Sequence, residues 1–365
     1  PPRSTLFPYT TLFRSFGTVS PQSSAKNVIC IGAVNDAVSG GSRSTGAASM
    51  SDFSAYGPTD DGRIKPDLVA NGVSVISLSN TSNSATSTAS GTSMACPNAA
   101  GTAALLVDYF DSKFSGQSMR ASMLKALLIH TADDLGNAGP DFRYGWGLID
   151  AKAAADVIKD TASNTTKARF LDGKLTTTDT SDTFTFDYDG SGELRVTLSW
   201  TDPKGSTINS HDSRSARLVH DLNLKITGPN GTHYPYVMPW TGNWSDSKLN
   251  DAATTGVNSV DNVEQVYVSA PVSGTYTVTV DHAGSLTADQ IYSLILTGGD
   301  FASEVPDGGS NLNYSRVSGF GTIEPFNIYE RFSSAHDTTY TISVDDSSVV
   351  TAAIDGSGNV IITEA

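Results

Sequence analysis

The chain has 365 residues, with 38 acidic side chains against 23 basic ones and a formal net charge of −15. The length predicts two or three domains with a sizeable hydrophobic core. The acidic excess, without a basic cluster, excludes the electrostatic footprint of a protein that binds nucleic acid or an anionic membrane, and it fits an exported protein or one that binds divalent cations. No apolar run approaches the ~20 residues that a membrane-spanning helix needs. We therefore expect no membrane span, no nucleic-acid partner and, most simply, a monomer.

Residues 1–15, PPRSTLFPYTTLFRS, show neither helical nor strand periodicity and repeat Thr-Leu-Phe at 5–7 and 11–13. Residues 5–15 resemble the translation of a common DNA sequencing adapter. We therefore interpret residues 1–15 as an artefact outside the fold, with native sequence from about Phe16. A disordered native terminus is the alternative.

Two short apolar runs come next, NVICIGAV at 27–34 and VSVISLS at 73–79, and each predicts a buried strand. The stretch 52–72 between them is rich in Gly, Pro and Asp and predicts an ordered loop. Helical patterns then cover 94–110, 118–136 and 149–158. Strands followed by helices predict an α/β domain with a mainly parallel sheet, over residues 16–160.

After about Lys159 the pattern changes to alternating polar and apolar residues, separated by turn signals such as Pro229-Asn230-Gly231. This period of two predicts an all-β domain over 161–300, an antiparallel sandwich or jelly roll. Residues 301–365 look like a linker and the first strands of a further, Ig-like β module that stops before it can close. We therefore expect a chain that is truncated at both ends.

Only two cysteines occur, Cys30 and Cys96. They either form one disulfide or are two small buried hydrophobic side chains, which is the commoner fate of an isolated cysteine.

The stretch Ser90–Pro97, SGTSMACP, places two serines beside a glycine, directly before an alanine-rich helical pattern. A serine hydroxyl is a weak nucleophile that needs a base and donors for the developing oxyanion. Ser93 has the better position, because Gly91 allows a close approach and the N–H groups at the start of the helix favour an anion. A Ser or Thr helix cap explains the same residues equally well.

Three motifs resemble segments of the subtilisin-like serine proteases, and they follow one another along the chain in the same order as in that family. SGTSMACP followed by AAGTAAL is similar to the serine segment of that family, whose usual form is Gly-Thr-Ser-Met-Ala-x-Pro. FSAYGPTDDGRIKPDLVANGVSVIS resembles the loop and strand before the serine, and GPDFRYGWGLIDAKAA at 139–154 resembles the end of the catalytic domain. The resemblance covers roughly 17–155. It departs at Asn98, where a histidine is common, and at Asn71, where the family usually has proline.

This resemblance implies a secreted endopeptidase that acts on proteins or peptides, with Ser93 as the nucleophile and the Ser93 backbone N–H as one oxyanion donor. It makes Asp67 a structural residue. The six histidines of the chain all follow Ser93: His130, His211, His220, His233, His282 and His336. The catalytic Asp and His and the oxyanion Asn of the family are therefore missing from this sequence, and we expect the 365-residue chain to be inactive.

Two other function classes remain open. An α/β-hydrolase esterase carries Gly-x-Ser-x-Gly with its acid and histidine downstream, but here position 95 is alanine, and His130 and His220 lie in a predicted helix and a predicted strand. A non-catalytic adhesive or carbohydrate-binding protein would need clustered exposed aromatic side chains, although aromatics buried in a sandwich are commoner. The candidates are Trp200, Tyr236, Trp240 and Trp244.

Residues 166–299 resemble the C-terminal jelly-roll domain of certain bacterial subtilisin-like proteases, which is related to the P domain of proprotein convertases. The matching segments are LSWTDP, LVHDLNLKITGPNGTHY and DNVEQVYVSAPVSGTYTVTV. Such domains stabilise the catalytic domain and often carry calcium, which binds several oxygen ligands at once. We therefore predict structural calcium and no organic cofactor, with the alternative of a solvated acidic surface or turn caps. The predicted ligands are Asp202, Asp221, Asp261, Asn262 and Glu264.

Overall fold

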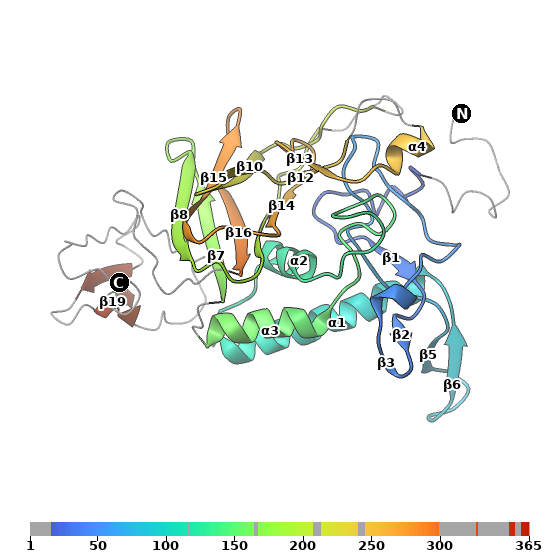
Figure 1. Cartoon of the computed structure of the whole chain (residues 1–365). Coiled ribbons are helices and arrows are strands. Elements are labelled where there is room, and N and C mark those ends of the chain that lie inside the picture. Colours follow the sequence, from blue (N-terminus) through green and yellow to red (C-terminus); the bar gives the residue numbers. More distant parts are fainter. Residues whose placement is uncertain are drawn as a thin grey trace.

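The computed structural model describes residues 16–114, 117–163, 167–206, 213–239 and 245–298, together with three short strands between 326 and 364. The predicted artefact at 1–15 lies outside the described residues. The described chain forms an α/β part over 16–163, followed by antiparallel β-sheets (Figure 1). None of the described helices is both long and apolar enough to cross a bilayer.

The α/β part is built on a parallel pair of strands, β1 (Ile31–Val34) and β4 (Leu68–Asn71), with Ile31 opposite Leu68. β1 confirms the buried strand predicted at 27–34, since Ala33 and Val34 are fully buried. β4 lies inside the stretch that was predicted as a loop, so that prediction is wrong for 68–71. Its four residues are too short a run to stand out between Pro66-Asp67 and Gly72.

The strand predicted at 73–79 forms, but it is not buried. β5 (Val75–Leu78) pairs with β6 (Thr86–Ala89) as an antiparallel hairpin. Ile76 is 70% exposed and Leu78 80% exposed, because this two-stranded ribbon extends away from the helices and no described element packs on it (Figure 1). A second small hairpin joins β2 (Val38–Ser39) to β3 (Ser42–Arg43) ahead of a 3₁₀ turn at Thr45–Ala47.

Three helices follow as predicted: α1 (Thr92–Lys113), α2 (Ala121–His130) and α3 (Ala151–Ala162). α1 packs against the strand pair through the buried Ala95 and Ala99. α2 ends at His130, six residues earlier than predicted, because the chain then turns and Asp133 exchanges backbone hydrogen bonds with Leu148. α3 begins at an N-cap in which the Asp150 carboxylate accepts from the Ala153 N–H at 2.9 Å.

The alternating segments after residue 166 form an antiparallel β-sandwich of two four-stranded sheets. One sheet has the order β14-β9-β16-β7, with bounds Val263–Val268, Leu194–Trp200, Gln290–Thr297 and Ala168–Leu175. The other has the order β11-β10-β15-β8, with bounds Gly231–His233, Asp221–Gly228, Gly274–Ala283 and Ser181–Tyr188. Large side chains from both sheets, among them Trp200, Tyr276 and Tyr292, form one hydrophobic core between them.

Smaller elements complete the described chain. β12 (Tyr236–Val237) pairs with β13 (Thr254–Thr255) on either side of a short helix α4 (Asp246–Leu249). In the C-terminal segment, β17 (Phe326–Asn327), β18 (Val350–Ile354) and β19 (Asn359–Glu364) form a three-stranded antiparallel sheet. This is the segment where a further β module was predicted.

The outer face of the β14-β9-β16-β7 sheet is covered by α2 (Figure 1). Thr197, Ser199 and Ser293 occupy this face and are fully buried, although alternation alone predicts that such polar positions face water. Ser293 meets Ser122 of α2 with 2.8 Å between the two hydroxyl oxygens. One face of this sheet contributes to the core of the sandwich and the other packs on α2, which belongs to the core of the α/β part. We call this contact between α2 and the sheet the joint.

The first prediction compares two leucines in short strands that differ in burial: Leu68, the first residue of β4, and Leu78, the last residue of β5. Leu68→Ala removes a fully buried side chain and should lower the free energy of unfolding by about 2–5 kcal/mol. Leu78→Ala alters a side chain that is 80% exposed and should stay within about 0.5 kcal/mol. Urea unfolding of the two variants measures both values, and equal losses would contradict this assignment of the core.

Candidate functional site

Ser93 lies in the first turn of α1, where the helix begins beside the carboxyl ends of β1 and β4. The Gly91 N–H donates to the Gly72 carbonyl at 2.8 Å, which joins the start of the helix to the segment that leaves β4. The region outside the carboxyl ends of parallel strands is where α/β folds bind ligands. The free N–H groups of a first helical turn carry partial positive charge, so an anion formed at Ser93 would be stabilised here.

The two serines of the motif differ in their contacts. Ser90 Oγ accepts a hydrogen bond from the Ser74 N–H at 2.8 Å and so ties the two ends of the β5–β6 hairpin together. The Ser93 side chain is exposed. The N-cap residue of α1 is Gly91, and no side chain caps the helix. The helix-cap alternative for this serine is therefore wrong, because neither Thr92 nor Ser93 occupies the cap position.

Gly72 is required for the close approach of strand and helix. A Cβ atom at position 72 would lie 2.7 Å from the Ala33 Cβ, 2.8 Å from the Gly91 carbonyl oxygen and 3.0 Å from the Ala95 Cβ. Only glycine fits there without moving the start of α1. The neighbouring Asn71, which stands where the resembled family has proline, accepts from the Val73 N–H at 3.1 Å and so stabilises the turn that leaves β4.

Asp67 is a buried structural residue, as the resemblance implied. Its carboxylate accepts from the Cys30 N–H at 2.7 Å and forms ion pairs with Lys65 and, at 3.0 Å, with Lys125. Burial alone would raise the pKa of Asp67, but the two lysines and the hydrogen bonds outweigh burial and hold that pKa below its ordinary value. The negative charge fixes the starts of β1 and β4 and the middle of α2.

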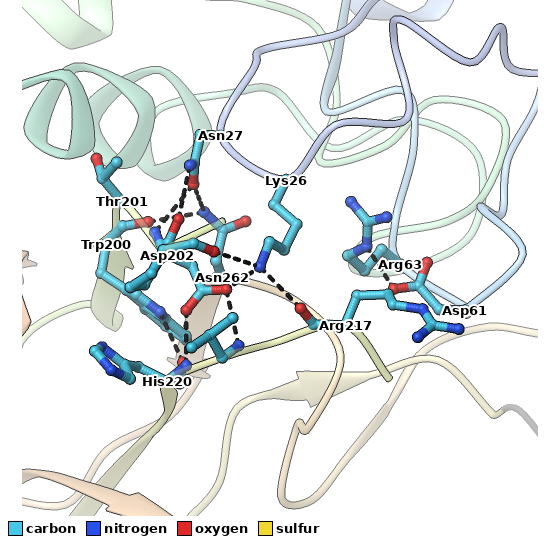
Figure 2. A network of polar contacts seen from close by, with 12 residues as sticks. Lys26, Asn27, Asp61, Arg63, Trp200, Thr201, Asp202, Arg217, His220 and Asn262 are labelled. Carbon is cyan, nitrogen blue, oxygen red and sulfur yellow. Dashed lines mark hydrogen bonds and ion pairs between the residues drawn. The ribbon is translucent and has the colours of Figure 1, made fainter. Parts of the chain in front are cut away.

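A second polar group of contacts joins the segment before β1 to the sandwich, and Figure 2 shows it. Lys26 pairs with Asp202 and donates to the Pro203 and Arg217 carbonyls at 2.9 and 2.8 Å. Asn27 both donates to the Asp202 carbonyl at 2.9 Å and accepts from the Asp202 N–H at 3.0 Å. Nothing in the sequence indicated these contacts, because Lys26 and Asp202 are 176 positions apart.

The contacts of the predicted calcium ligands do not favour a shared ion site. Asp202 is taken up by Lys26 and by the Val219 and His220 N–H groups. Asn262 donates to the Trp200 carbonyl at 2.7 Å, and its amide oxygen is therefore the only part of that side chain left for a cation.

The other three predicted ligands are acids, of which Asp261 and Glu264 are buried and Asp221 is half-buried. Asp261 accepts from the Ile64 N–H at 2.9 Å, and Glu264 from the Leu224 N–H at 2.7 Å. Burial raises the pKa of Asp261 to about 6. Burial and the charge of Asp202 raise the pKa of Asp221 to about 6 as well. Burial also raises the pKa of Glu264 well above its usual range. The described residues hold no group of three or more His, Cys, Asp or Glu side chains placed to bind a metal. Asp221 Oδ1 and Glu264 Oε1 are buried without a hydrogen-bond partner, and calcium binding stays a prediction from the sequence.

The histidines that an esterase would need are already engaged. The His220 ring lies between Gln290 and Thr287, and the His130 ring lies between Thr197 and Thr297. Ala95 is fully buried against Gly72, where the esterase motif needs glycine. The geometry therefore gives the esterase alternative no support.

The aromatic side chains of the sandwich are not gathered on an open face of the described residues. Trp200 is 1% exposed in the sandwich core. Tyr236 packs edge-on against Trp146, with 6.4 Å between the ring centroids. Trp240 and Trp244 lie outside the described residues. The surface that an adhesive or carbohydrate-binding protein needs is not formed by the candidates that the structure describes.

Both cysteines are free thiols. Cys30 is half-buried, and burial followed by the charge of Asp67 raises the pKa of its thiol to about 11. Cys96 is exposed on α1, so the expectation of two buried cysteines is wrong for this one.

Comparison with known proteins gives a family for the first part of the chain: residues 13–147 match the Subtilase family. The serine protease/ABC transporter B family protein tagA of Dictyostelium discoideum is 27% identical over 276 residues, covering 67% of this chain and 15% of that protein. The serine protease AprX of Bacillus subtilis is 33% identical over 147 residues, covering 37% of this chain and 31% of that protein. This chain thus spans a small part of the length of these relatives.

Among solved structures, the patellamide maturation protease PatA matches with 23% identity and a TM-score of 0.30, covering 38% of this chain and 45% of that one. A lanthipeptide protease matches with 23% identity and a TM-score of 0.29, covering 37% and 43%.

The second prediction separates the two serines by stability. Ser90→Ala loses the hydrogen bond to the Ser74 N–H and should lower the free energy of unfolding by roughly 0.5–1.5 kcal/mol. Ser93→Ala changes an exposed hydroxyl and should stay within about 0.5 kcal/mol. Thermal and urea unfolding give both values. A larger loss for Ser93→Ala than for Ser90→Ala would mean that Ser93 has a structural role.

Proposed function

We propose, because residues 13–147 match the Subtilase family, that the protein is part of a secreted serine endopeptidase that hydrolyses peptide bonds in proteins or peptides. One observation carries the proposal: Ser93 is exposed in the first turn of α1, two residues after the N-cap Gly91 and beside the carboxyl ends of the parallel strands. The relatives named as serine proteases support the same reaction class.

In this proposal Ser93 Oγ attacks the carbonyl carbon of a peptide bond while a histidine takes the hydroxyl proton. The Ser93 N–H stabilises the oxyanion that forms on the carbonyl oxygen. The C–N bond then breaks, the histidine passes its proton to the leaving amine, and an acyl-enzyme remains. Water hydrolyses this ester and returns the proton to Ser93.

The histidine itself is not supplied by the described residues. His130 and His220 are engaged, as described above, and His233 and His282 lie on the sandwich strands β11 and β15. His211 and His336 lie outside the described residues. From the resemblance to the family, we propose that the base, the Asp that orients it and the second oxyanion donor come from sequence outside these 365 residues.

The sandwich is proposed to be a jelly roll that supports the α/β part. Its strand order supports this topology: β7, β9, β14 and β16 share one sheet, and β8, β10, β11 and β15 share the other, so that successive strands mostly cross between sheets. Secretion and a monomeric state are further parts of the proposal, supported by the resemblance and the acidic composition alone.

The third prediction concerns the chain as given. The 365-residue protein should show no peptide hydrolysis and no labelling by a fluorophosphonate probe, because none of the histidines that the structure describes is placed to activate the Ser93 hydroxyl. Gel fluorescence after incubation with the probe measures this, with Ser93→Ala and the exposed Ser87→Ala as paired controls. Strong labelling that Ser93→Ala removes and Ser87→Ala retains would overturn the proposal that the base lies elsewhere.

A further inference from the structure

His130 is the last residue of α2, the helix that lies between the α/β part and the sandwich (Figure 1). It is 2% exposed. Its Nδ1 is 2.9 Å from Thr197 Oγ1 on β9, and its Nε2 is 2.8 Å from Thr297 Oγ1 on β16. One imidazole ring therefore binds two strands of the sheet that α2 covers.

The hydrogen bonds around the ring fix its protonation. Gln265 on β14 donates its amide N–H to Thr197 Oγ1 at 2.9 Å. Thr197 can then donate its own proton to His130 Nδ1, and His130 Nε2–H donates to Thr297. This series of hydrogen bonds gives both nitrogens of a neutral His130 ring a partner. A protonated ring would turn Nδ1 into a donor facing Thr197, whose proton would lose its acceptor.

The charges around the ring also oppose protonation. Arg195 on β9 donates to the His130 carbonyl at 2.7 Å. Glu193 pairs with the other end of that guanidinium at 3.2 Å, and Tyr267 on β14 lies under it, 5.0 Å from ring centroid to guanidinium carbon. Asp134, four residues beyond α2, also interacts with Arg195. Burial first, and then the positive charge of Arg195, hold the pKa of His130 well below its ordinary value.

The remaining charged groups at this joint are paired away from the ring. On α2 itself, Lys125 pairs with Asp67. In the segment after α2, Asp133 pairs with Arg43. Thr297 and Ser293 are the neutral contacts that β16 offers to α2. A proton added to His130 would therefore have no described carboxylate bonded to the ring to offset it.

We propose that His130 is an acid-sensitive latch that holds α2 on the β14-β9-β16-β7 sheet while its ring is neutral and releases α2 when its ring is protonated. The two cores then uncouple in acid, each keeping its own strands. This device is independent of the proposed peptidase activity, because it uses no atom near Ser93.

The direction in which stability changes with pH follows from the linkage between protonation and folding. The unfolded chain takes up a proton at the pKa of an ordinary histidine, ~6.5, whereas the folded chain does not until far lower pH. The stability that the neutral ring contributes is complete above that pH. As the pH falls below that value, this stability is lost. The folded-to-open ratio falls by up to about tenfold for each pH unit.

The test is hydrogen exchange of the 365-residue chain at pH 7.5 and 5.5, corrected for intrinsic exchange rates. We expect the amides of α2 to lose protection at pH 5.5, up to about tenfold, while those of β15 inside the sandwich keep theirs. The loss of α2 protection between pH 7.5 and 5.5 should be smaller in His130→Gln than in the wild type; Asp261, which interacts with Lys125 of α2 and has a pKa raised to about 6, titrates in both proteins. The matched control is His220→Gln, because His220 is also buried between polar partners but lies within the sandwich. It should behave in α2 as the wild type does.

Unchanged α2 protection in the wild type, or the same acid loss in His130→Gln, would overturn the latch. If His130→Gln does not fold, ¹⁵N-histidine spectra of the wild type serve instead, with the His130 signals identified by their shift in Thr297→Val. The ring should stay neutral, with the proton on Nε2, for as long as α2 is protected. An imidazolium signal from His130 in the folded protein would overturn the proposal.

Discussion

The buried carboxylate of Asp67 is the interaction on which the other parts of this structure depend. It collects a backbone N–H at the entry to β1 and two lysines, Lys65 before β4 and Lys125 in α2. Taking such charges out of water costs several kcal/mol for each ion, and removing one partner of a buried pair typically costs about 3–5 kcal/mol. The three elements are therefore held together as a set, and none can shift without leaving a buried charge unpaired.

The effect of this set reaches the serine in one direction and the sandwich in the other. β4 directly follows Asp67 and leads to Gly72, where the lack of a Cβ lets the start of α1 approach and present Ser93. Lys125 also donates to the Lys26 carbonyl at 3.0 Å, and Lys26 pairs with Asp202 of the sandwich. The sandwich is thus bound to the same residues that fix the serine. α2 adds contacts to β9 and β16, and His130 at its end lies within hydrogen-bond distance of Thr197 and Thr297.

Sequence patterns predicted what depends on neighbours in the chain and missed what depends on distant ones. The three helices followed from apolar spacing, and the choice of Ser93 over Ser90 agrees with the hydrogen bond that occupies Ser90. The prediction that 73–79 is buried was wrong, because an apolar run does not show whether another element packs on it. The strand at 68–71 was hidden by its short length. The predicted ligand Asp202 turned out to be bonded to Lys26, 176 positions away, a contact that no local pattern reveals.

We propose Ser93, held by strands that Asp67 fixes, as the nucleophile of a subtilisin-like peptidase. Mass spectrometry of the protein expressed from its source gene and treated with a fluorophosphonate tests this proposal. The account predicts a single phosphonylated peptide, carrying the adduct on Ser93 and absent from Ser93→Ala. An adduct on another serine, with hydrolysis that survives Ser93→Ala, would contradict it.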